Sequence, residues 1–342
     1  MDRKQYEKDS RYQTERNKIQ LSSKNQRKKR RRMKYLRRML FLLVLLVLLI
    51  LAAAAVLSII RRQEPGIHVD NSTLHSENIS MDKLNSPNAI LTELKSGETI
   101  AQRGADDRIY PASLTKIMTA LVAIENISDL DETMTSPYDF YQYLYQMDAS
   151  MAGFEPGETA KARDYIYGVI LASGAECCLT LAEAVSGSEQ GFVDLMNQKA
   201  AELGMDDTHF SNTTGLQDAE HYTTVRDLSL LLDSALKNAE FREVFTSRSY
   251  TVQPTNVHPE GFTIGSTLFE NAGNTGLKNG EILGGKTGYT DEAGLCLASL
   301  AEVDGEEYIL VTAHAPGSHE TEQYHILDAI TVYNELADAV RD

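Results

Sequence analysis

Cysteine is scarce in this chain of 342 residues, which contains only Cys177, Cys178 and Cys296. An odd number of cysteines cannot be paired completely, so the sequence argues against a disulfide framework. Cys177 and Cys178 are adjacent in an apolar, helix-like run. We therefore expect them to be small, buried core residues.

Two further patterns are missing. The sequence has no internal repeat, and it has no tight histidine pair of the H-E-x-x-H type, which is typical of a zinc peptidase. We expect neither a metal nor another cofactor. The histidines that a metallopeptidase would have to use are instead expected to be surface or hydrogen-bonded residues: His209, His221, His314, His319 and His325.

Charge is distributed unevenly along the chain. The formal net charge is −16, but residues 1–38 carry +12, so the remaining residues carry −28. Such asymmetry indicates different compartments or partners for the two parts. The acidic part argues against binding to nucleic acid, whose phosphates attract positive side chains.

A long apolar run separates the two parts. Residues 39–60 read MLFLLVLLVLLILAAAAVLSII and contain no charged residue. A bilayer core of ~30 Å needs about 20 helical residues, so this run can span it. A cleaved signal peptide would have about 7–15 apolar residues and a shorter basic region. We therefore expect an uncleaved transmembrane signal anchor, although Ala52–Ala55 could mimic a cleavage site.

The basic cluster RKKRRRMKYLRR, directly before the apolar run, predicts a cytoplasmic N-terminus and an extracytoplasmic chain after Arg62. Residues 1–38 are expected to be a disordered basic tail. The tail either serves only as a topology signal or binds a cytoplasmic partner, anionic lipid or nucleic acid. Residues 61–88 are rich in turn formers and read as an extracytoplasmic linker.

The folded domain is expected over residues 89–342. AILTEL and TIAQR flank a glycine turn and predict two strands, and GLCLASLAEV and EEYILVTAHA predict two more around Asp304-Gly305. Between these ends the sequence has helical periodicity, with a break near Ser173–Gly174 and a C-cap glycine at Gly204. Strands at both ends with helices between them predict one α+β domain whose terminal strands share a sheet.

The stretch RIYPASLTKIMTA places Ser113 and Lys116 three residues apart at the start of a predicted helix. On a helix this spacing puts the two side chains on the same face. A serine hydroxyl becomes a good nucleophile when a neighbouring base takes its proton, and lysine is such a base only when burial or a second cation lowers its pKa. On its own the pattern also fits a serine that caps a helix.

Two later segments carry related side chains. Lys286 and Thr287 follow Gly284 and Gly285 and precede Gly288, so a cation and a hydroxyl stand where the backbone can be approached closely. They suit a substrate carboxylate, and Lys286 is a candidate for the second cation beside Lys116. The alternative is a glycine-rich hairpin with a solvated lysine.

Ser173 lies at the break between two predicted helices. Its hydroxyl can relay a proton between Lys116 and a leaving amine. It can equally cap the second helix.

The order Ser113-x-x-Lys116, then Ser173-Gly174-x, then Lys286-Thr287-Gly288 resembles the motif set of the penicillin-recognising serine enzymes. In particular, the sequence is similar to the low-molecular-mass penicillin-binding proteins, the serine-type D-alanyl-D-alanine carboxypeptidases. Ser113 and Ser173 are 60 residues apart, and Ser173 and Lys286 are 113 apart. The resemblance implies a penicillin-binding, β-lactamase-like transpeptidase domain, with an antiparallel sheet flanked by helices and a helical subdomain, preceded by the membrane helix.

The resemblance also implies roles for individual residues. Ser113 would attack the D-Ala-D-Ala bond of a peptidoglycan pentapeptide, Lys116 would be its base and Ser173 would pass the proton to the departing D-alanine. Lys286 and Thr287 would hold the terminal carboxylate. Backbone N–H groups of Ser113 and Tyr289 would form the oxyanion hole, and β-lactams would acylate Ser113 as inhibitors.

Two positions depart from the family pattern. Ala175 stands where the family usually has the asparagine of the middle motif, which affects substrate binding and turnover. Tyr289 replaces a frequent histidine, a change that an oxyanion role through the backbone tolerates.

Other functions remain open at this point. A β-lactamase shares the first and third motifs but usually has a Ser-Asp-Asn middle motif. A non-catalytic or weakly active penicillin-binding scaffold of the cell wall is favoured by Ala175 and disfavoured by the presence of Ser113, Lys116 and Lys286. The tyrosine-rich segment 136–150 is expected to be a packed amphipathic segment, with part of a wall over the cleft as the alternative.

Overall fold

The computed structural model describes residues 79–340. The predicted basic tail and signal anchor lie outside the described residues, as does most of the predicted linker. Within the described part, no helix combines the length and apolar character needed to cross a membrane.

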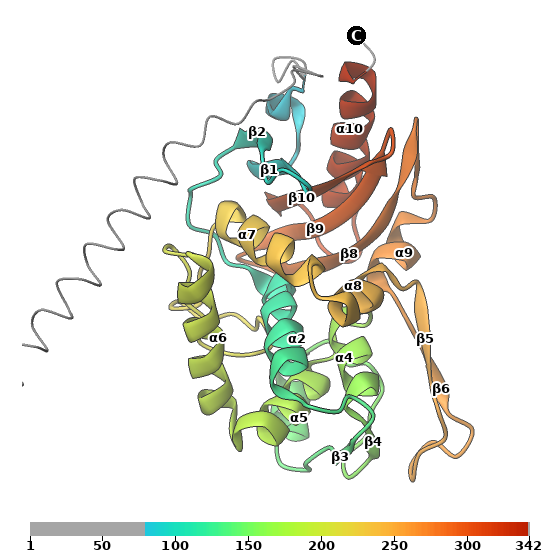
Figure 1. Cartoon of the computed structure of the whole chain (residues 1–342). Helices are drawn as coiled ribbons and strands as arrows, with labels where there is room; N and C mark the ends of the chain where they lie inside the picture. Colours follow the sequence, from blue (N-terminus) through green and yellow to red (C-terminus); the bar gives the residue numbers. More distant parts are fainter. Residues whose placement is uncertain (1–78, 341–342) are drawn as a thin grey trace, which may run out of the picture. The chain divides into compact units, whose positions relative to one another are not determined.

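The centre of the described domain is a six-stranded antiparallel sheet (Figure 1). Its strands follow the order β2-β1-β10-β9-β8-β7. The N- and C-terminal strands therefore share one sheet, which confirms the α+β prediction. Asp304 and Gly305, both with positive φ, form the predicted tight hairpin between β9 and β10. The strands are β1 (Asn88–Glu93), β2 (Thr99–Arg103), β7 (Gly276–Leu277), β8 (Gly280–Thr290), β9 (Gly294–Val303) and β10 (Glu306–Ala315).

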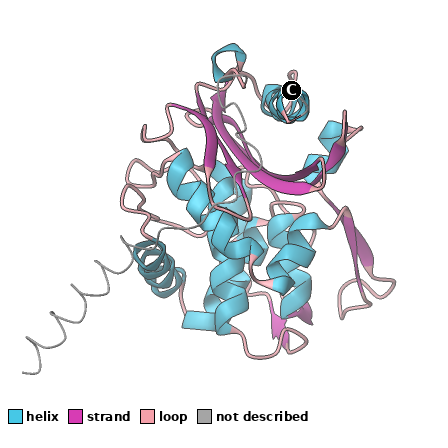
Figure 2. Ribbon diagram, turned by 45° about the horizontal axis from the view of Figure 1, so that its top comes forward, coloured by secondary structure: helices cyan, strands magenta, loops and turns pink. Residues whose placement is uncertain are grey.

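Helix α10 (Tyr324–Ala339) covers one face of this sheet, and a larger helical layer covers the other (Figure 2). Alternate strand residues point to opposite faces. Thus Leu91 and Leu310 join the core beneath α10, whereas Ile90 and Val311 join the core of the helical layer. The described domain has two large hydrophobic cores, which are separated by the sheet, and a third small cluster formed by Leu144, Ala175 and Leu179.

The helical layer is built around α2 (Thr115–Asn126), in which ten of twelve residues are buried. The helices predicted from periodicity are present, including the break between α4 and α5. Gly204 ends α6 with φ +73°, a left-handed conformation that favours glycine. The remaining helices of this layer are α4 (Ala162–Ile170), α5 (Ala175–Ser186), α6 (Glu189–Leu203), α7 (Val225–Leu236) and α8 (Ala239–Thr246).

Several short elements were not predicted individually, because they are too short to show periodicity. They are η2 (Met81–Lys83), η3 (Ala112–Leu114), α3 (Tyr141–Gln146), α9 (Thr267–Ala272), and the two small hairpins β3 (Thr133–Thr135)–β4 (Thr159–Lys161) and β5 (Ser249–Val252)–β6 (Phe262–Gly265). Residues 79–87, placed in the linker by the sequence, pack on the domain. The Asp328 carboxylate on α10 accepts hydrogen bonds from the backbone N–H groups of Asn85 and Ser86, which fastens this segment to the last helix.

The tyrosine-rich segment has one buried and one exposed face. Tyr141 is buried, but Tyr138, Tyr143 and Tyr145 are among the most exposed large side chains. One face of the segment is therefore packed and the other is exposed, which agrees with the predicted packed amphipathic segment. The predicted burial of Cys177 and Cys178 is confirmed, and Cys296 is buried as well; all three cysteines are free.

Candidate active site

Ser113 lies in η3, directly before α2, in a turn that the surrounding chain fixes tightly. Ala112 has φ +46°, a conformation that residues with a side chain rarely adopt. Gly215 presses against the Ala112 carbonyl so closely that an added Cβ would lie 1.9 Å from its oxygen. Gly288 of β8 approaches the other side, where an added Cβ would lie 3.0 Å from the Ser113 nitrogen. The serine is thus held between a loop and the sheet.

Lys116, one helical turn further on, points back to this serine. Its Nζ lies 3.1 Å from Ser113 Oγ and donates to the Thr214 carbonyl at 2.5 Å. The side chain is only 2% exposed. Burial disfavours the charged form and lowers the pKa of Lys116 below its usual range.

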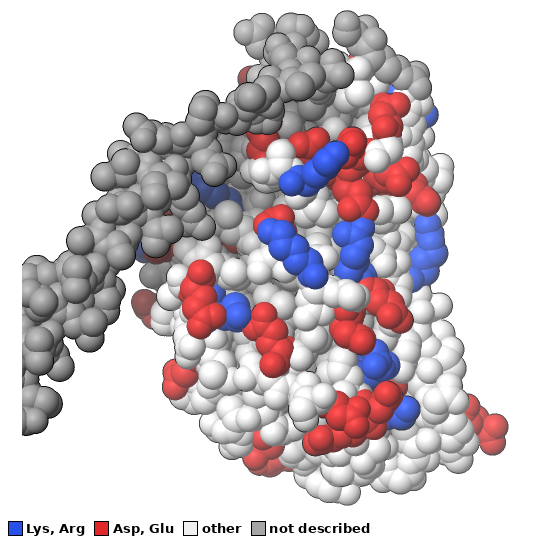
Figure 3. Space-filling model, viewed as in Figure 1, with Lys and Arg blue, Asp and Glu red and all other residues white. Residues whose placement is uncertain are grey.

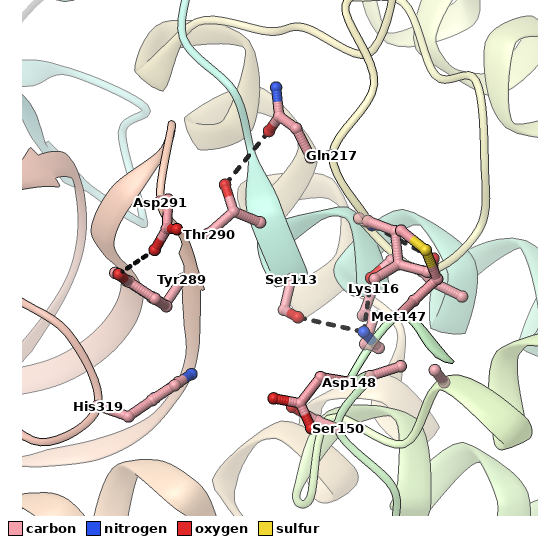
Figure 4. Close-up of a pocket in the computed structure, with 15 residues that line it drawn as sticks. Ser113, Lys116, Met147, Asp148, Ser150, Gln217, Tyr289, Thr290, Asp291 and His319 are labelled. Atoms are coloured by element: carbon pink, nitrogen blue, oxygen red, sulfur yellow. Dashed lines mark hydrogen bonds between the residues drawn. The ribbon is translucent and has the colours of Figure 1, made fainter. Parts of the chain in front are cut away.

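The Ser113–Lys116 pair opens onto a cavity of about 330 Å³. Figure 4 shows Asp148 and Ser150 on one side of it and Tyr289 and His319 on the opposite side. The segment after α3 therefore forms one wall, which was the alternative reading of the tyrosine-rich stretch. The other residues lining the cavity are Met147, Ala149, Ala175, Thr214, Gly215, Leu216, Gln217, Thr290 and Asp291.

Strand β8 carries the predicted Lys286-Thr287-Gly288 motif behind this cavity. Lys286 is fully buried, so the solvated-lysine alternative is wrong. Its Nζ donates to the Thr287 carbonyl at 2.7 Å, and the Thr287 hydroxyl contacts that of Thr267 at 2.9 Å. Neither side chain is part of the cavity lining.

The two buried lysines influence each other. The pKa of Lys286 is lowered, first by burial and then by the charge of Lys116. Electrostatic repulsion is mutual, so the same proximity disfavours charge on either amine. The structure therefore brings together two amines that are 170 positions apart in the sequence.

Ser173 occupies the break between α4 and α5 in a left-handed conformation, with φ +63°. It is 5% exposed, and its Oγ has no hydrogen-bond partner among residues 79–340. No hydrogen bond joins it to Lys116, whose Nζ bonds Ser113 and Thr214 instead. The hydroxyl is thus buried without a partner beside the helix that begins at Ala175.

Ala175 and Glu176 begin α5. Ala175 lines the cavity, and its methyl group cannot form the hydrogen bonds that an asparagine would. Glu176 does not replace the missing asparagine, because its carboxylate is bonded elsewhere. Its Oε1 accepts hydrogen bonds from the backbone N–H groups of Ala152, Gly153 and Phe154 at 2.6, 3.0 and 3.3 Å. Burial raises the pKa of this carboxyl. Glu176 therefore fixes the loop that follows the cavity wall.

Tyr289 lies at the rim, where its hydroxyl donates to Asp291 at 2.6 Å and its ring packs edge-on against His319. His319, which was expected to be a surface or hydrogen-bonded residue, lines the cavity, as do Thr214 and Gln217, for which the sequence indicated no role. The loop SNTTGLQ around Thr214 carried a signal, since it belongs to the family-like stretches. Its contact with Lys116 could not be inferred from the spacing of residues.

Within the described residues, no group of His, Cys, Asp and Glu is arranged to hold a metal ion.

The surface around the domain carries both signs of charge. On the face shown in Figure 3, Lys and Arg side chains lie beside Asp and Glu side chains. Arg163 pairs with Glu240 at 2.7 Å and Arg108 with Asp207 at 3.1 Å. Such exposed pairs contribute little to stability.

A buried lysine held against a serine, in a cavity between an antiparallel sheet and a helical layer, defines a serine hydrolase of the penicillin-recognising fold. More particularly, residues 75–317 match the peptidase family S11, described as D-alanyl-D-alanine carboxypeptidase. The chain belongs to this family, which confirms the resemblance inferred from the three motifs.

Individual relatives agree with this assignment. The chain is 30% identical over 243 residues to D-alanyl-D-alanine carboxypeptidase DacF of Bacillus subtilis, covering 70% of this chain and 60% of that protein. It is 31% identical over 220 residues to a D-alanyl-D-alanine carboxypeptidase of Streptomyces sp. (strain K15), covering 62% and 75%. The crystal structure of the DD-transpeptidase from that strain matches with a TM-score of 0.68 and 26% identity, covering 75% of this chain and 99% of the other.

Proposed function

We propose that this protein is a membrane-anchored serine D-alanyl-D-alanine carboxypeptidase that removes the terminal D-alanine from peptidoglycan stem peptides. The observation that carries the proposal is the 3.1 Å contact between Lys116 Nζ and Ser113 Oγ at the base of the cavity. Membership of the D-alanyl-D-alanine carboxypeptidase family supports the choice of substrate.

The first chemical step would form an acyl-enzyme on Ser113. Lys116, in its neutral form, takes the hydroxyl proton as Ser113 Oγ attacks the carbonyl carbon of the D-Ala-D-Ala bond. Burial favours that neutral form, because it lowers the pKa of the lysine. The proton then passes through Ser173 to the nitrogen of the departing D-alanine, and the C–N bond breaks.

Backbone N–H groups of Ser113 and Tyr289 would stabilise the negative carbonyl oxygen. The close approach of Gly288 to the Ser113 nitrogen supports this role, since it brings the end of β8 beside η3. Donors fixed before the reaction give a large part of the rate of acyl transfer. Water then hydrolyses the acyl-enzyme and releases the shortened peptide.

The Lys286 ammonium and the Thr287 hydroxyl would bind the terminal carboxylate of the substrate. Their position on β8, next to the Ser113 turn, supports this assignment. A carboxylate near both lysines would also offset their mutual repulsion.

Anchoring is the part of the proposal that rests on sequence alone. The apolar run 39–60 and the basic cluster before it support a single-pass protein with a cytoplasmic N-terminus and an extracytoplasmic catalytic domain.

Labelling with a fluorescent penicillin tests the catalytic proposal. Because a β-lactam is opened by the same nucleophile, the parent protein should carry a stable covalent label that mass spectrometry locates on Ser113. Ser113→Ala should abolish the label, whereas Ser96→Ala, in the exposed turn between β1 and β2, should leave it unchanged. No label on the parent would favour the scaffold function that Ala175 permits, and rapid loss of the label would favour a β-lactamase.

A further inference from the structure

The loop between α6 and α7 contacts the turn that carries Ser113 and the start of α2. Two of these contacts come from the middle of the loop. The Thr214 carbonyl accepts from Lys116, and Gly215 packs against the Ala112 carbonyl. A third connection comes from His221, at the end of this loop. It uses side chains that the proposed chemistry does not involve.

His221 is a buried side chain with a defined protonation pattern. It is 2% exposed, and its Nδ1 accepts a hydrogen bond from the Ser211 backbone N–H at 2.9 Å. An imidazole nitrogen that accepts carries no proton, so the proton of the neutral ring is on Nε2. Burial lowers the pKa of His221 to about 4, in keeping with a ring that is neutral.

The Nε2–H of His221 is directed at Thr115, the first residue of α2. The two atoms, Nε2 and Thr115 Oγ1, are 2.7 Å apart. Thr115 Oγ1 in turn donates to the Ala112 carbonyl at 2.8 Å, so it is free to accept from the ring. The result is a continuous chain of hydrogen bonds from the Ser211 backbone through His221 and Thr115 to Ala112.

The chain of hydrogen bonds ends at a residue with an unfavourable backbone conformation. Ala112 has φ +46°, which an L-residue adopts only when its surroundings hold it there. Its carbonyl belongs to the peptide that also carries the Ser113 nitrogen. Thr115 is next to Lys116 in the sequence. The hydrogen-bond chain therefore acts on the residues flanking both members of the Ser113–Lys116 pair.

We propose that His221 is a positioning residue for the reaction at Ser113. Acting through Thr115, it holds the Ala112 carbonyl and so keeps Ser113 Oγ within reach of Lys116 Nζ. His221 itself touches neither the nucleophile nor the base. The inference rests on the proposed function, in which Ser113 is acylated.

Two substitutions separate the two hydrogen bonds of the ring. In His221→Gln the side-chain amide reaches as far as Nε2 and can donate to Thr115, but it leaves the Ser211 N–H unpaired. In His221→Asn the amide reaches only as far as Nδ1, so it can pair with Ser211 but not with Thr115. Positioning through Thr115 predicts that Gln preserves function better than Asn.

The readout is the acylation of purified protein by a β-lactam, followed by stopped-flow fluorescence so that noncovalent binding and the acylation step are measured separately. A small misplacement of reacting groups lowers a rate by roughly 10²-fold. We expect His221→Asn to lower the acylation rate constant by roughly 10–100-fold with little change in noncovalent binding. His221→Gln should stay within about threefold of the parent rate, because the bond that positions the turn is kept.

His325→Gln is the matched control. His325 is also buried, at 1% exposure, and its pKa is also lowered to about 4 by burial, but it belongs to α10 on the other face of the sheet. This variant should acylate at the parent rate, whatever its thermal stability. Thr115→Val and Thr115→Ser provide a second pair, in which Val removes the hydroxyl and Ser keeps it.

The outcomes are distinct. Loss of acylation in His221→Asn and Thr115→Val, with recovery in His221→Gln and Thr115→Ser, supports the proposal. Equal rates in Asn and Gln, or a lower rate in Gln than in Asn, overturns it, because His221 would then act only on Ser211 or not at all. If His221→Asn does not fold, the Thr115 pair decides in the same way. Failure of the parent itself to be acylated would instead refute the proposed function.

Discussion

The two faces of the sheet bury different kinds of residue. Under α10 the core is formed largely by aliphatic side chains such as Leu91, Leu310 and Leu336, and the buried Asp328 carboxylate on this side is paired with backbone N–H groups. The helical layer on the opposite face has the larger apolar core, but it also buries Lys116, Glu176 and Lys286. Burying apolar surface stabilises a fold, whereas burying an amine or a carboxyl costs free energy unless the group is neutral or well paired.

This difference indicates a division of work within one domain. The α10 side contributes stability without taking part in the proposed chemistry. On the helical side, burying Lys116 against Ser113 costs some stability, and it also lowers the pKa of the lysine. Substitutions under α10 should therefore change mainly the stability of the fold. Substitutions of the buried lysines on the helical side should change mainly the rate of acylation.

The largest contrast is expected between Lys116→Met and Leu310→Ala. A positioned base contributes typically 10²–10⁴-fold to a rate, so Lys116→Met should lower β-lactam acylation by roughly 10³-fold. Its melting temperature should be unchanged or higher, because an apolar chain of similar length replaces a buried amine.

Leu310→Ala should show the opposite behaviour. Removing a fully buried leucine costs about 2–5 kcal/mol, so the melting temperature should fall by several degrees. Acylation by the folded fraction should be unaffected. Calorimetry and acylation kinetics on both variants test the contrast, which fails if Lys116→Met is strongly destabilised or if Leu310→Ala acylates slowly.

Lys286→Met tests the role of the second buried lysine on the helical side. A hydrogen bond to a charged partner contributes about 1.5–3 kcal/mol, so we expect hydrolysis of a peptide ending in D-Ala-D-Ala to lose roughly 10–100-fold in kcat/KM. The same peptide with an amidated C-terminus offers no carboxylate and should lose much less. Equal losses on the two peptides would show that Lys286 does not bind the carboxylate.

The two sides of the sheet should differ least in how their stability depends on pH, because each side contains one buried neutral histidine. The pKa values of His221 and His325 are lowered from 6.5 to about 4 by burial. The unfolded chain takes up protons first, so stability is lost as the pH falls from 6.5 towards 4, by roughly 3 kcal/mol for each histidine. Denaturant titrations across this range should show a shallower decline in His325→Gln than in the parent. A parallel decline would mean that His325 does not titrate in this way.

The sequence predicted the parts of the fold that periodicity specifies. Long amphipathic helices, the Asp304-Gly305 hairpin and the Gly204 C-cap follow from local patterns, and the order of strands and helices led to the shared sheet. The pairing of Ser113 with Lys116 also follows from local spacing, because one helical turn separates them.

The rest depended on contacts between segments far apart in the chain. The Thr214 carbonyl that receives Lys116 is 98 residues away, and no periodic signal marks it. Similarly, Glu176 could not be assigned from sequence, because its partners are backbone groups of the loop at Ala152–Phe154. Which tyrosines of the amphipathic segment are buried could not be assigned from the sequence, because α3 is only six residues long.

The attachment of residues 85 and 86 to Asp328 has a mechanical consequence. Tension applied to the chain ahead of the domain would be borne first by the hydrogen bond from Ser80 N–H to Glu335 and then by those to Asp328, both of which attach the chain to α10. The load would then pass into the sheet from the face opposite the crevice. A pull at the leading end of the described chain would therefore load α10 and its face of the sheet, which is not the face that carries the Ser113–Lys116 pair.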